Sequence, residues 1–205
     1  MRDSLGRFTK QTIHGQGIFD SSKTTKEEGK PYIKWRQMLE RCYSEAYKRK
    51  EQSYKHCYVC DEWKFYSNFK QWFNSHYIEG FELDKDLLGD GVLYSPETCC
   101  FIPKHINLAI PKKKTRGKFF TGVRFNGTSY VCQTMGISGK VEHLGSYKTY
   151  EEAINVYLNH KSEYIRYLSD VYKNVLDERV YKKLSNFDCK QFISRMSENY
   201  METVS

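Results

Sequence analysis

The sequence has little proline and no long hydrophobic run, and these absences exclude several classes of protein. Its 205 residues include only 4 prolines, and 28% of them are charged. No stretch has the apolar length of a membrane-spanning helix, and the first ten residues contain no apolar signal core. The 7 cysteines are odd in number, which argues against a secreted disulfide framework and for a reducing compartment. We therefore expect a cytoplasmic protein with no membrane partner.

Acidic residues are absent from one long interval. No Asp or Glu occurs between Glu97 and Glu142. The basic residues of this interval match the whole net charge of +8. They are Lys104, Lys112, Lys113, Lys114, Arg116, Lys118, Arg124 and Lys140. A basic segment in an otherwise neutral chain points to a polyanionic partner, of which nucleic acid is the commonest.

Hydrophobic periodicity and turn signals predict an α+β fold in several parts. Trp35, Met38, Leu39, Cys42 and Tyr43 repeat as one buried helix face, with Pro31 at the start of the helix. Five parts are expected: a flexible basic arm (1–30), a helical unit with a ββα element (31–110), a basic linker (111–118), a sheet-and-helix domain (119–169) and a helical tail (170–205).

Further elements are expected within 31–110. Ser67 is the expected N-cap of a second helix that carries Phe69, Trp72 and Phe73 on one side. Strands and a short helix are expected after it, at Phe81–Leu88, Leu93–Pro103 and Lys104–Ile110.

Residues 119–169 show the clearest pattern. Three strands are expected, at Phe120–Phe125, Ser129–Met135 and Val141–Tyr147. Asn126-Gly127 is a hairpin signal between the first two strands. Thr149 is expected to cap a helix that carries Glu151 and Glu152 in its first turn. The economical fold is a three-stranded antiparallel sheet packed on one helix.

Strand alternation predicts which side chains of this sheet point away from the helix. The outward set is Arg124, Asn126, Gln133, Met135 and His143. Arginine pairs with guanine, and asparagine or glutamine pairs with adenine, in the major groove. The sheet is therefore expected to bind double-stranded DNA, with the linker residues Lys112, Lys113, Lys114, Arg116 and Lys118 on phosphates.

The same segment resembles a known family. Gly122-Val-Arg124, Tyr130, and the run from His143-Leu-Gly145 through Ala153 to Tyr157 are similar to the Apetala-type (ethylene-response-factor) DNA-binding domain. The resemblance implies a three-stranded sheet inserted in the major groove. Gln133, Met135 and His143 stand where the plant domain has more arginine and tryptophan, so base preference does not carry over.

The preceding strand pair resembles the ββα-metal core of phage HNH (His-Me finger) homing endonucleases. The resemblance rests on Phe81-Glu-Leu-Asp84-Lys85-Asp86-Leu and Tyr94-Ser-Pro-Glu-Thr-Cys99-Cys-Phe-Ile-Pro103. It implies that Asp84 binds a divalent metal and that Asn107 is the helix ligand. Lys85 occupies the position of the general-base histidine.

This departure from the family pattern bears on catalysis. Lysine titrates near pH 10.4, and the flanking Asp84 and Asp86 favour its charged form, so Lys85 is a poor base. Lys85 suits a phosphate contact better, and His105 is a possible substitute base. Asp84 and Asp86 point the same way on a strand, so together they can hold Mg²⁺ or Mn²⁺.

The cysteines offer a second metal hypothesis. Cys57 and Cys60 form a CxxC, and Cys99 and Cys100 lie downstream, which together suit a structural Zn²⁺ site. Because no second CxxC follows, buried thiols are the alternative.

Three functions stay open. The first is a duplex-DNA-binding protein of the phage HNH–Apetala type with an altered nuclease site, acting in the bacterial host cell. The second is an active Mg²⁺-dependent DNA endonuclease or nickase. The third is a protein-binding inhibitor or interaction module. The helical tail at 170–205 packs on the core or forms a homodimer.

Overall fold

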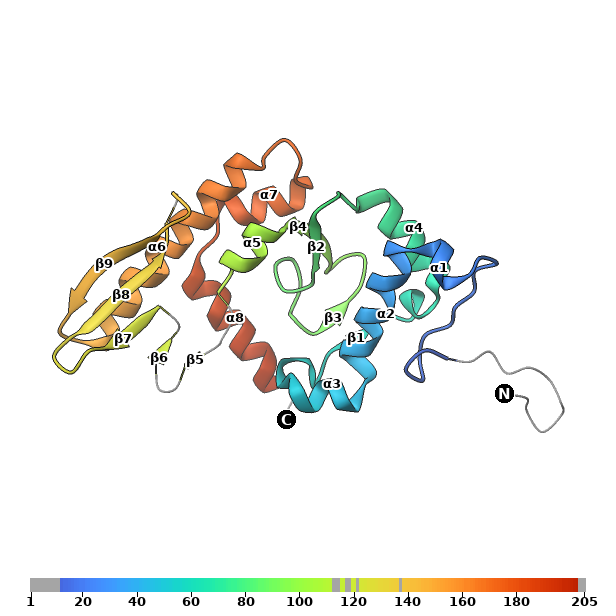
Figure 1. Ribbon diagram of the computed structural model, residues 1–205, viewed down its shortest axis with the longest axis horizontal. Coiled ribbons are helices and arrows are strands. Elements are labelled where there is room, and N and C mark those ends of the chain that lie inside the picture. Colours follow the sequence, from blue (N-terminus) through green and yellow to red (C-terminus); the bar gives the residue numbers. More distant parts are fainter. Residues whose placement is uncertain (1–11, 112–114, 117–118, 121, 137, 203–205) are drawn as a thin grey trace. The chain divides into compact units, whose positions relative to one another are not determined.

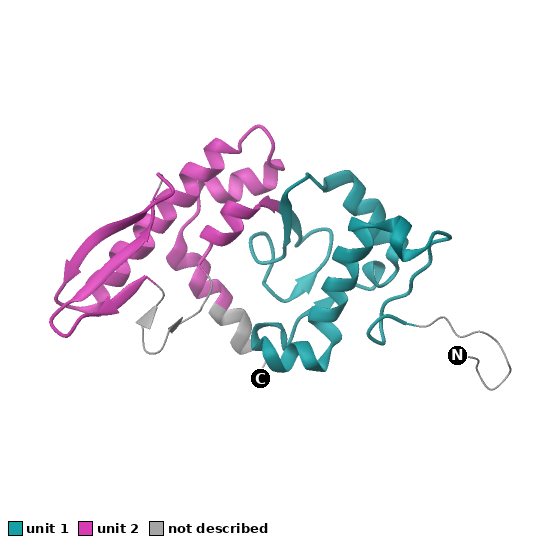
Figure 2. Ribbon diagram, viewed as in Figure 1, with its two compact units in different colours: residues 1–101 teal, residues 102–205 magenta. Residues whose placement is uncertain are grey.

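The computed structural model has an α+β fold (Figure 1). It describes residues 12–111, 115–116, 119–120, 122–136 and 138–202. Among these residues, no helix is long and apolar enough to cross a membrane. The described part divides into two compact units, residues 1–101 and 102–205 (Figure 2), and this division falls inside the region 31–110 that the sequence treats as one unit.

Unit 1 is built from short helices around an aromatic core. Its helices are α1 (Thr25–Glu28), α2 (Lys30–Tyr43), α3 (Glu45–Lys50), η1 (Gln52–Tyr54), η2 (Glu62–Lys64) and α4 (Tyr66–His76). The predicted apolar face of α2 is confirmed, since Trp35, Met38, Leu39 and Cys42 are buried. The indole N–H of Trp35 donates to the carbonyl oxygen of Trp63 (2.7 Å), which satisfies the polar atom of a fully buried ring.

The start of α4 differs from the sequence expectation. The N-cap is Phe65 rather than Ser67, and Phe65 makes no side-chain cap hydrogen bond. The carboxylate of Asp20 instead accepts from the backbone N–H (2.8 Å) and the hydroxyl (2.6 Å) of Ser67. A residue far upstream therefore caps the helix, which a local pattern cannot reveal.

The described part of the expected flexible arm, residues 12–30, is packed on unit 1. Ile18 forms a parallel bridge with Phe65. The buried carboxylate of Glu28 contacts Lys70 (2.6 Å) and accepts from the Tyr66 hydroxyl (2.9 Å). A Cβ added to Gly17 would lie 2.2 Å from Leu39 Cδ1, so the backbone at Gly17 lies directly on the core. Residues 1–11 lie outside the described residues.

The strands of this region are shorter than the sequence predicts. They are β1 (Tyr58–Val59), β2 (Phe81–Asp84), β3 (Leu93–Tyr94) and β4 (Cys100–Pro103), with β1 paired to β3 in parallel and β2 paired to β4. The expected strand Phe81–Leu88 ends at Asp84, where the chain turns. The expected strand Leu93–Pro103 is two strands in different sheets, because a hydrogen-bonded turn at Ser95–Thr98 interrupts it.

Unit 2 contains the predicted three-stranded sheet. Its elements are α5 (Lys104–Ala109), β5 (Thr115–Arg116), β6 (Phe119–Phe120), β7 (Val123–Phe125), β8 (Tyr130–Met135), β9 (Val141–Tyr147), α6 (Tyr150–Val171), α7 (Glu178–Ser185) and α8 (Cys189–Glu202). The sheet has the antiparallel order β7-β8-β9, and α6 packs along one side of it (Figure 1). The predicted cap of α6 is confirmed, since Thr149 and Glu152 form a capping box.

Two boundaries in unit 2 differ from expectation. The expected strand Phe120–Phe125 is interrupted at Gly122, which has φ +104°, and Phe119–Phe120 pair with β5 instead. That pairing places a short strand inside the expected linker at 111–118. The helical tail is confirmed as the two helices α7 and α8, while Val171 belongs to the end of α6.

Candidate nucleic-acid interface

The sheet β7–β9 presents exposed side chains on the side away from α6, which we call the outer face. Val123, Cys132 and Thr134 are buried on the helix side. Their strand neighbours therefore point outward. The exposed residues of the outer face are Arg124, Gln133, Met135, Val141, His143 and Ser146. Four of the five side chains that the sequence assigned to this face lie on it, and the fifth, Asn126, lies in the hairpin turn.

The register brings polar groups together across β8 and β9. Gln133 lies directly opposite His143, and Val131 beside them pairs with Arg124 of β7. Directly opposed residues have Cβ atoms about 5 Å apart. The outer face therefore holds an amide and an imidazole as one cross-strand pair, with a guanidinium on the neighbouring strand.

A bulge in β9 sets this arrangement. The pairing shifts between Cys132 and Gln133, which leaves Leu144 without a direct partner on β8. Gly145 takes φ +130° there, and the Tyr147 hydroxyl donates to the carbonyl oxygen of Leu144 (2.8 Å). Because one extra residue reverses the alternation, Ser146 and His143 both point outward. Simple strand alternation does not predict this bulge, although a glycine inside a strand is its usual signal.

The acid residue of the sheet is turned away from the outer face. Within the three strands, all of whose residues are described, Glu142 alone carries a carboxylate. Its Oε2 lies 3.3 Å from Nε2 of His160 on α6. A Cβ added to Gly136 would lie 1.7 Å from Glu142 Oε1, so the carboxylate packs directly on that backbone. The outer face thus carries a cation and polar groups without an opposing carboxylate.

Two ionisable groups buried between the sheet and α6 are uncharged at neutral pH. Burial raises the pKa of the Cys132 thiol to about 11 and that of the Tyr157 phenol to about 12. Neither group carries a charge under physiological conditions, so this side suits packing against α6.

Asn126 has a structural task at the tip of the first hairpin. Its Oδ1 accepts from the backbone N–H groups of Thr128 (3.0 Å) and Ser129 (2.9 Å). A bidentate contact with adenine needs this same oxygen. The predicted adenine contact at Asn126 therefore competes with the turn, whereas Gln133 carries its amide on the open sheet.

The predicted linker contacts fall mostly on residues that the structure does not describe. Lys112, Lys113, Lys114 and Lys118 lie outside the described residues. Arg116 belongs to β5, for which the backbone pairing alone is described.

The nuclease-like residues of unit 1 form a tight turn. Asp84 is buried, and its Oδ1 accepts from the backbone N–H groups of Asp86 (3.0 Å) and Leu87 (2.8 Å). Burial and then the nearby Asp86 carboxylate raise the pKa of Asp84 above its usual value. One oxygen of the carboxylate that the resemblance assigns to a metal is therefore engaged in the turn that ends β2.

Lys85 is enclosed rather than exposed. Its ammonium contacts Asp86 Oδ1 (2.6 Å), donates to the carbonyl oxygen of Gly91, and lies over the rings of Tyr54 (5.3 Å) and Tyr94 (5.7 Å). Burial works against the charge of Lys85, but Asp86, Cys57 and Tyr54 together outweigh burial and hold the lysine pKa above its usual value. A charged lysine with 8% of its side chain exposed is neither a general base nor an open phosphate contact.

The other nuclease-like residues lie on α5 in unit 2. His105 is exposed, with Nδ1 3.1 Å from the Tyr172 hydroxyl, and Asn107 is half-buried. Among the described residues, no group of three or more His, Cys, Asp or Glu side chains is placed to hold a metal. One oxygen of Asp84 accepts from two backbone amides, and one oxygen of Asp86 contacts the Lys85 ammonium. These described contacts hold the turn after β2, whereas Mg²⁺ or Mn²⁺ needs several oxygen ligands.

The cysteines proposed for zinc are separate thiols. Cys57, Cys99 and Cys100 are buried and Cys60 is half-buried. The Cys57 thiol donates to the carbonyl oxygen of Gly91 (3.5 Å). Burial raises the pKa of the Cys57, Cys60 and Cys99 thiols above the usual range. The described geometry accords with buried thiols.

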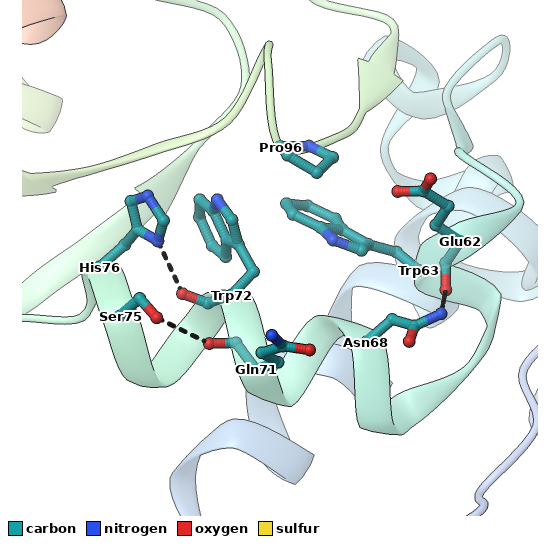
Figure 3. Close-up of a pocket in the computed structure, with 8 residues that line it drawn as sticks. All are labelled: Glu62, Trp63, Asn68, Gln71, Trp72, Ser75, His76 and Pro96. Atoms are coloured by element: carbon teal, nitrogen blue, oxygen red, sulfur yellow. Dashed lines mark hydrogen bonds between the residues drawn. The ribbon is translucent and has the colours of Figure 1, made fainter.

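Unit 1 also has an open groove of about 470 Å³ beside α4 (Figure 3). Trp63 and Trp72 form its floor with centroids 4.6 Å apart, and they are almost fully buried. The ring of His76 stacks on Trp72 (4.8 Å) and its Nδ1 lies 2.8 Å from the Trp72 carbonyl oxygen. Asn68 also bonds a nearby backbone carbonyl. The groove is the outer surface of the aromatic core, and its polar side chains His76 and Asn68 are engaged with backbone carbonyls.

Comparison of the chain with protein-family models, curated proteins and solved structures finds no match.

Proposed function

We propose that this chain binds double-stranded DNA and that the outer face of β7–β9 enters the major groove. The observation that carries the proposal is the outer face itself, where exposed Arg124, Gln133 and His143 lie together while Glu142 is turned to α6. These are side chains that hydrogen-bond base edges. A twisted antiparallel sheet is one of the elements that enter this groove.

The distribution of charge supports the same partner. The interval between Glu97 and Glu142 contains no Asp or Glu, and it includes α5 and the strands β5 to β8. The exposed Lys140 and Lys148 flank β9 at its two ends. Lysines around a base-contacting sheet suit phosphate contacts, which fix position along the duplex.

We propose that the HNH-like unit is a scaffold rather than a working nuclease. The buried contact between Lys85 and Asp86 and the turn held by Asp84 support this choice over an active endonuclease. The relationship to phage HNH–Apetala proteins remains part of the proposal, resting on the sequence resemblance. A Mg²⁺-dependent nickase is the alternative that a cleavage assay tests.

The proposed function is tested by measuring binding of the full chain to labelled duplex DNA at several salt concentrations. Counterion release predicts that the logarithm of the affinity falls linearly with the logarithm of the salt concentration. The slope of this line should be roughly −0.9 for each phosphate that the protein neutralises. If the chain does not bind DNA, or if its affinity does not change with salt concentration, the result would favour a protein-binding module and reject the proposal.

A further inference from the structure

The outer face has an apolar end next to its polar centre. Met135 lies directly opposite Val141 at the end of the β8–β9 pair, two residues beyond Gln133. Their exposed fractions are 43% and 63%. These two adjacent apolar side chains are open to contact with an apolar group of a molecule that lies on the outer face.

The surroundings of this pair select the kind of partner. Met135 and Val141 share the outer face with Arg124, Gln133 and His143, and Lys140 immediately precedes Val141. A polyanion that enters here must present an apolar group between its phosphates. In the major groove of DNA that group is the C5-methyl of thymine, which projects from the base edge.

The spacing fits one continuous contact along a groove. Gln133 and Met135 are two residues apart on β8, about 6.6 Å at strand rise. Base pairs are about 3.4 Å apart along each strand, so the two side chains reach bases about two steps apart. Methionine is unbranched and flexible, which lets it fit against a methyl group of variable position.

We infer that the Met135–Val141 pair contacts a thymine methyl group and makes this sheet select duplexes with thymine at one end of its site. The inference rests on the proposed function, because it requires the outer face to lie in the major groove. The two side chains determine specificity by packing, whereas Gln133 and Arg124 determine it by hydrogen bonding.

The test replaces thymine by deoxyuridine, which keeps every hydrogen-bonding group and lacks the methyl alone. The full chain first selects sites from a random duplex library, and each thymine of the recovered site is then replaced singly. We expect one position where deoxyuridine weakens wild-type binding by about 3- to 10-fold, as burial of one methyl group allows. In the variants Met135→Ala and Val141→Ala, the same deoxyuridine replacement should reduce affinity by less than about 2-fold.

Phe125→Ala is the matched control. Phe125 is 47% exposed on the same sheet, but it lies on the helix side and packs on Tyr130 with ring centroids 5.0 Å apart. This variant should keep the wild-type sensitivity to deoxyuridine. Circular dichroism of each variant verifies that the sheet is intact.

The outcomes separate the inference from the proposed function. If no duplex is recovered or bound, the proposed function fails. If duplexes are bound but contain no required thymine, or if deoxyuridine has no effect on the wild type, the inference alone is overturned. It is also overturned if the alanine variants remain as sensitive as the wild type, since the methyl is then contacted elsewhere.

Discussion

Gly122 lies directly against the ring of Tyr157, so that a Cβ added to the glycine would be 2.2 Å from Tyr157 Cε2. The contact joins the start of β7 to the middle of α6. Gly122 also has φ +104°, and its carbonyl oxygen accepts from the N–H of Gln133 (2.9 Å). One glycine therefore holds the sheet close to its helix and supports the backbone under an outer-face residue.

Gly122→Ala should destabilise unit 2 by about 2–3 kcal/mol, because it combines overpacking with an unfavourable backbone conformation. Urea unfolding followed by far-UV circular dichroism measures this change. Gly139→Ala is the control, since Gly139 has φ +73° but nothing within 4 Å of an added Cβ. It should cost about 1 kcal/mol. Equal effects of the two variants would show that the contact with Tyr157 is unimportant.

Glu28 should make unit 1 sensitive to acid. Contacts with Lys70, Ser21 and Tyr66 outweigh burial and lower the pKa of Glu28 from 4.5 to about 2. A carboxylate whose pKa is lowered in the folded state stabilises the fold at pH values above the pKa that it has in the unfolded chain. That contribution should disappear as the pH falls from about 4.5 to about 2.

Glu28→Gln should lower the free energy of unfolding at neutral pH by about 2 kcal/mol and flatten the acid dependence. Tryptophan fluorescence reports on this unit, because all three tryptophans lie in its core. Glu79→Gln is the control, since Glu79 is exposed and paired with exposed Lys30. An acid profile identical in wild type and Glu28→Gln would refute the role of this carboxylate.

The chain should not cleave DNA. The chain, incubated with supercoiled plasmid and Mg²⁺ or Mn²⁺, should produce no more nicked product than the same reaction with EDTA. One oxygen of Asp84 accepts from two backbone amides and one oxygen of Asp86 contacts Lys85, so both carboxylates serve structural contacts that compete with a metal. Metal-dependent nicking that disappears in Asp84→Ala would establish the endonuclease and remove the scaffold proposal.

Outer-face and linker residues should affect binding in different ways. Gln133→Ala should relax base preference at one position by about 1–3 kcal/mol. Changing Lys112, Lys113 and Lys114 together to alanine should weaken all sequences alike and reduce the salt slope by about 3. Site selection with each variant, together with salt titration, distinguishes the two effects. A changed base preference in the lysine variant would contradict this division of roles.

Local patterns predict the elements better than their boundaries. Thr149 with Glu152 and the face of α2 depend on residues three or four positions apart, and the sequence shows them directly. The cap of α4 by Asp20 depends on tertiary contact, so no local signal reveals it. The outward side chains of β8 follow simple alternation, whereas the second half of β9 follows a bulge.

The candidate site is predictable in part for the same reason. Gln133 and His143 are placed correctly because alternation holds over those residues. Asn126 is not, because its side-chain oxygen is used by the turn that the same residue signals. Lys85 is identified as an unusual residue from the sequence, but its burial against Tyr54 and Tyr94 requires the fold.

The central claim is most directly tested by the affinity of the triple variant Arg124→Ala, Gln133→Ala, His143→Ala for the duplex that the wild-type chain selects. We expect at least a tenfold loss at fixed salt, with an unchanged circular dichroism spectrum. Lys190→Ala, which removes an exposed lysine from α8, should bind as the wild type does. Wild-type affinity in the triple variant would contradict the account, because the outer face would then not be the DNA-binding surface.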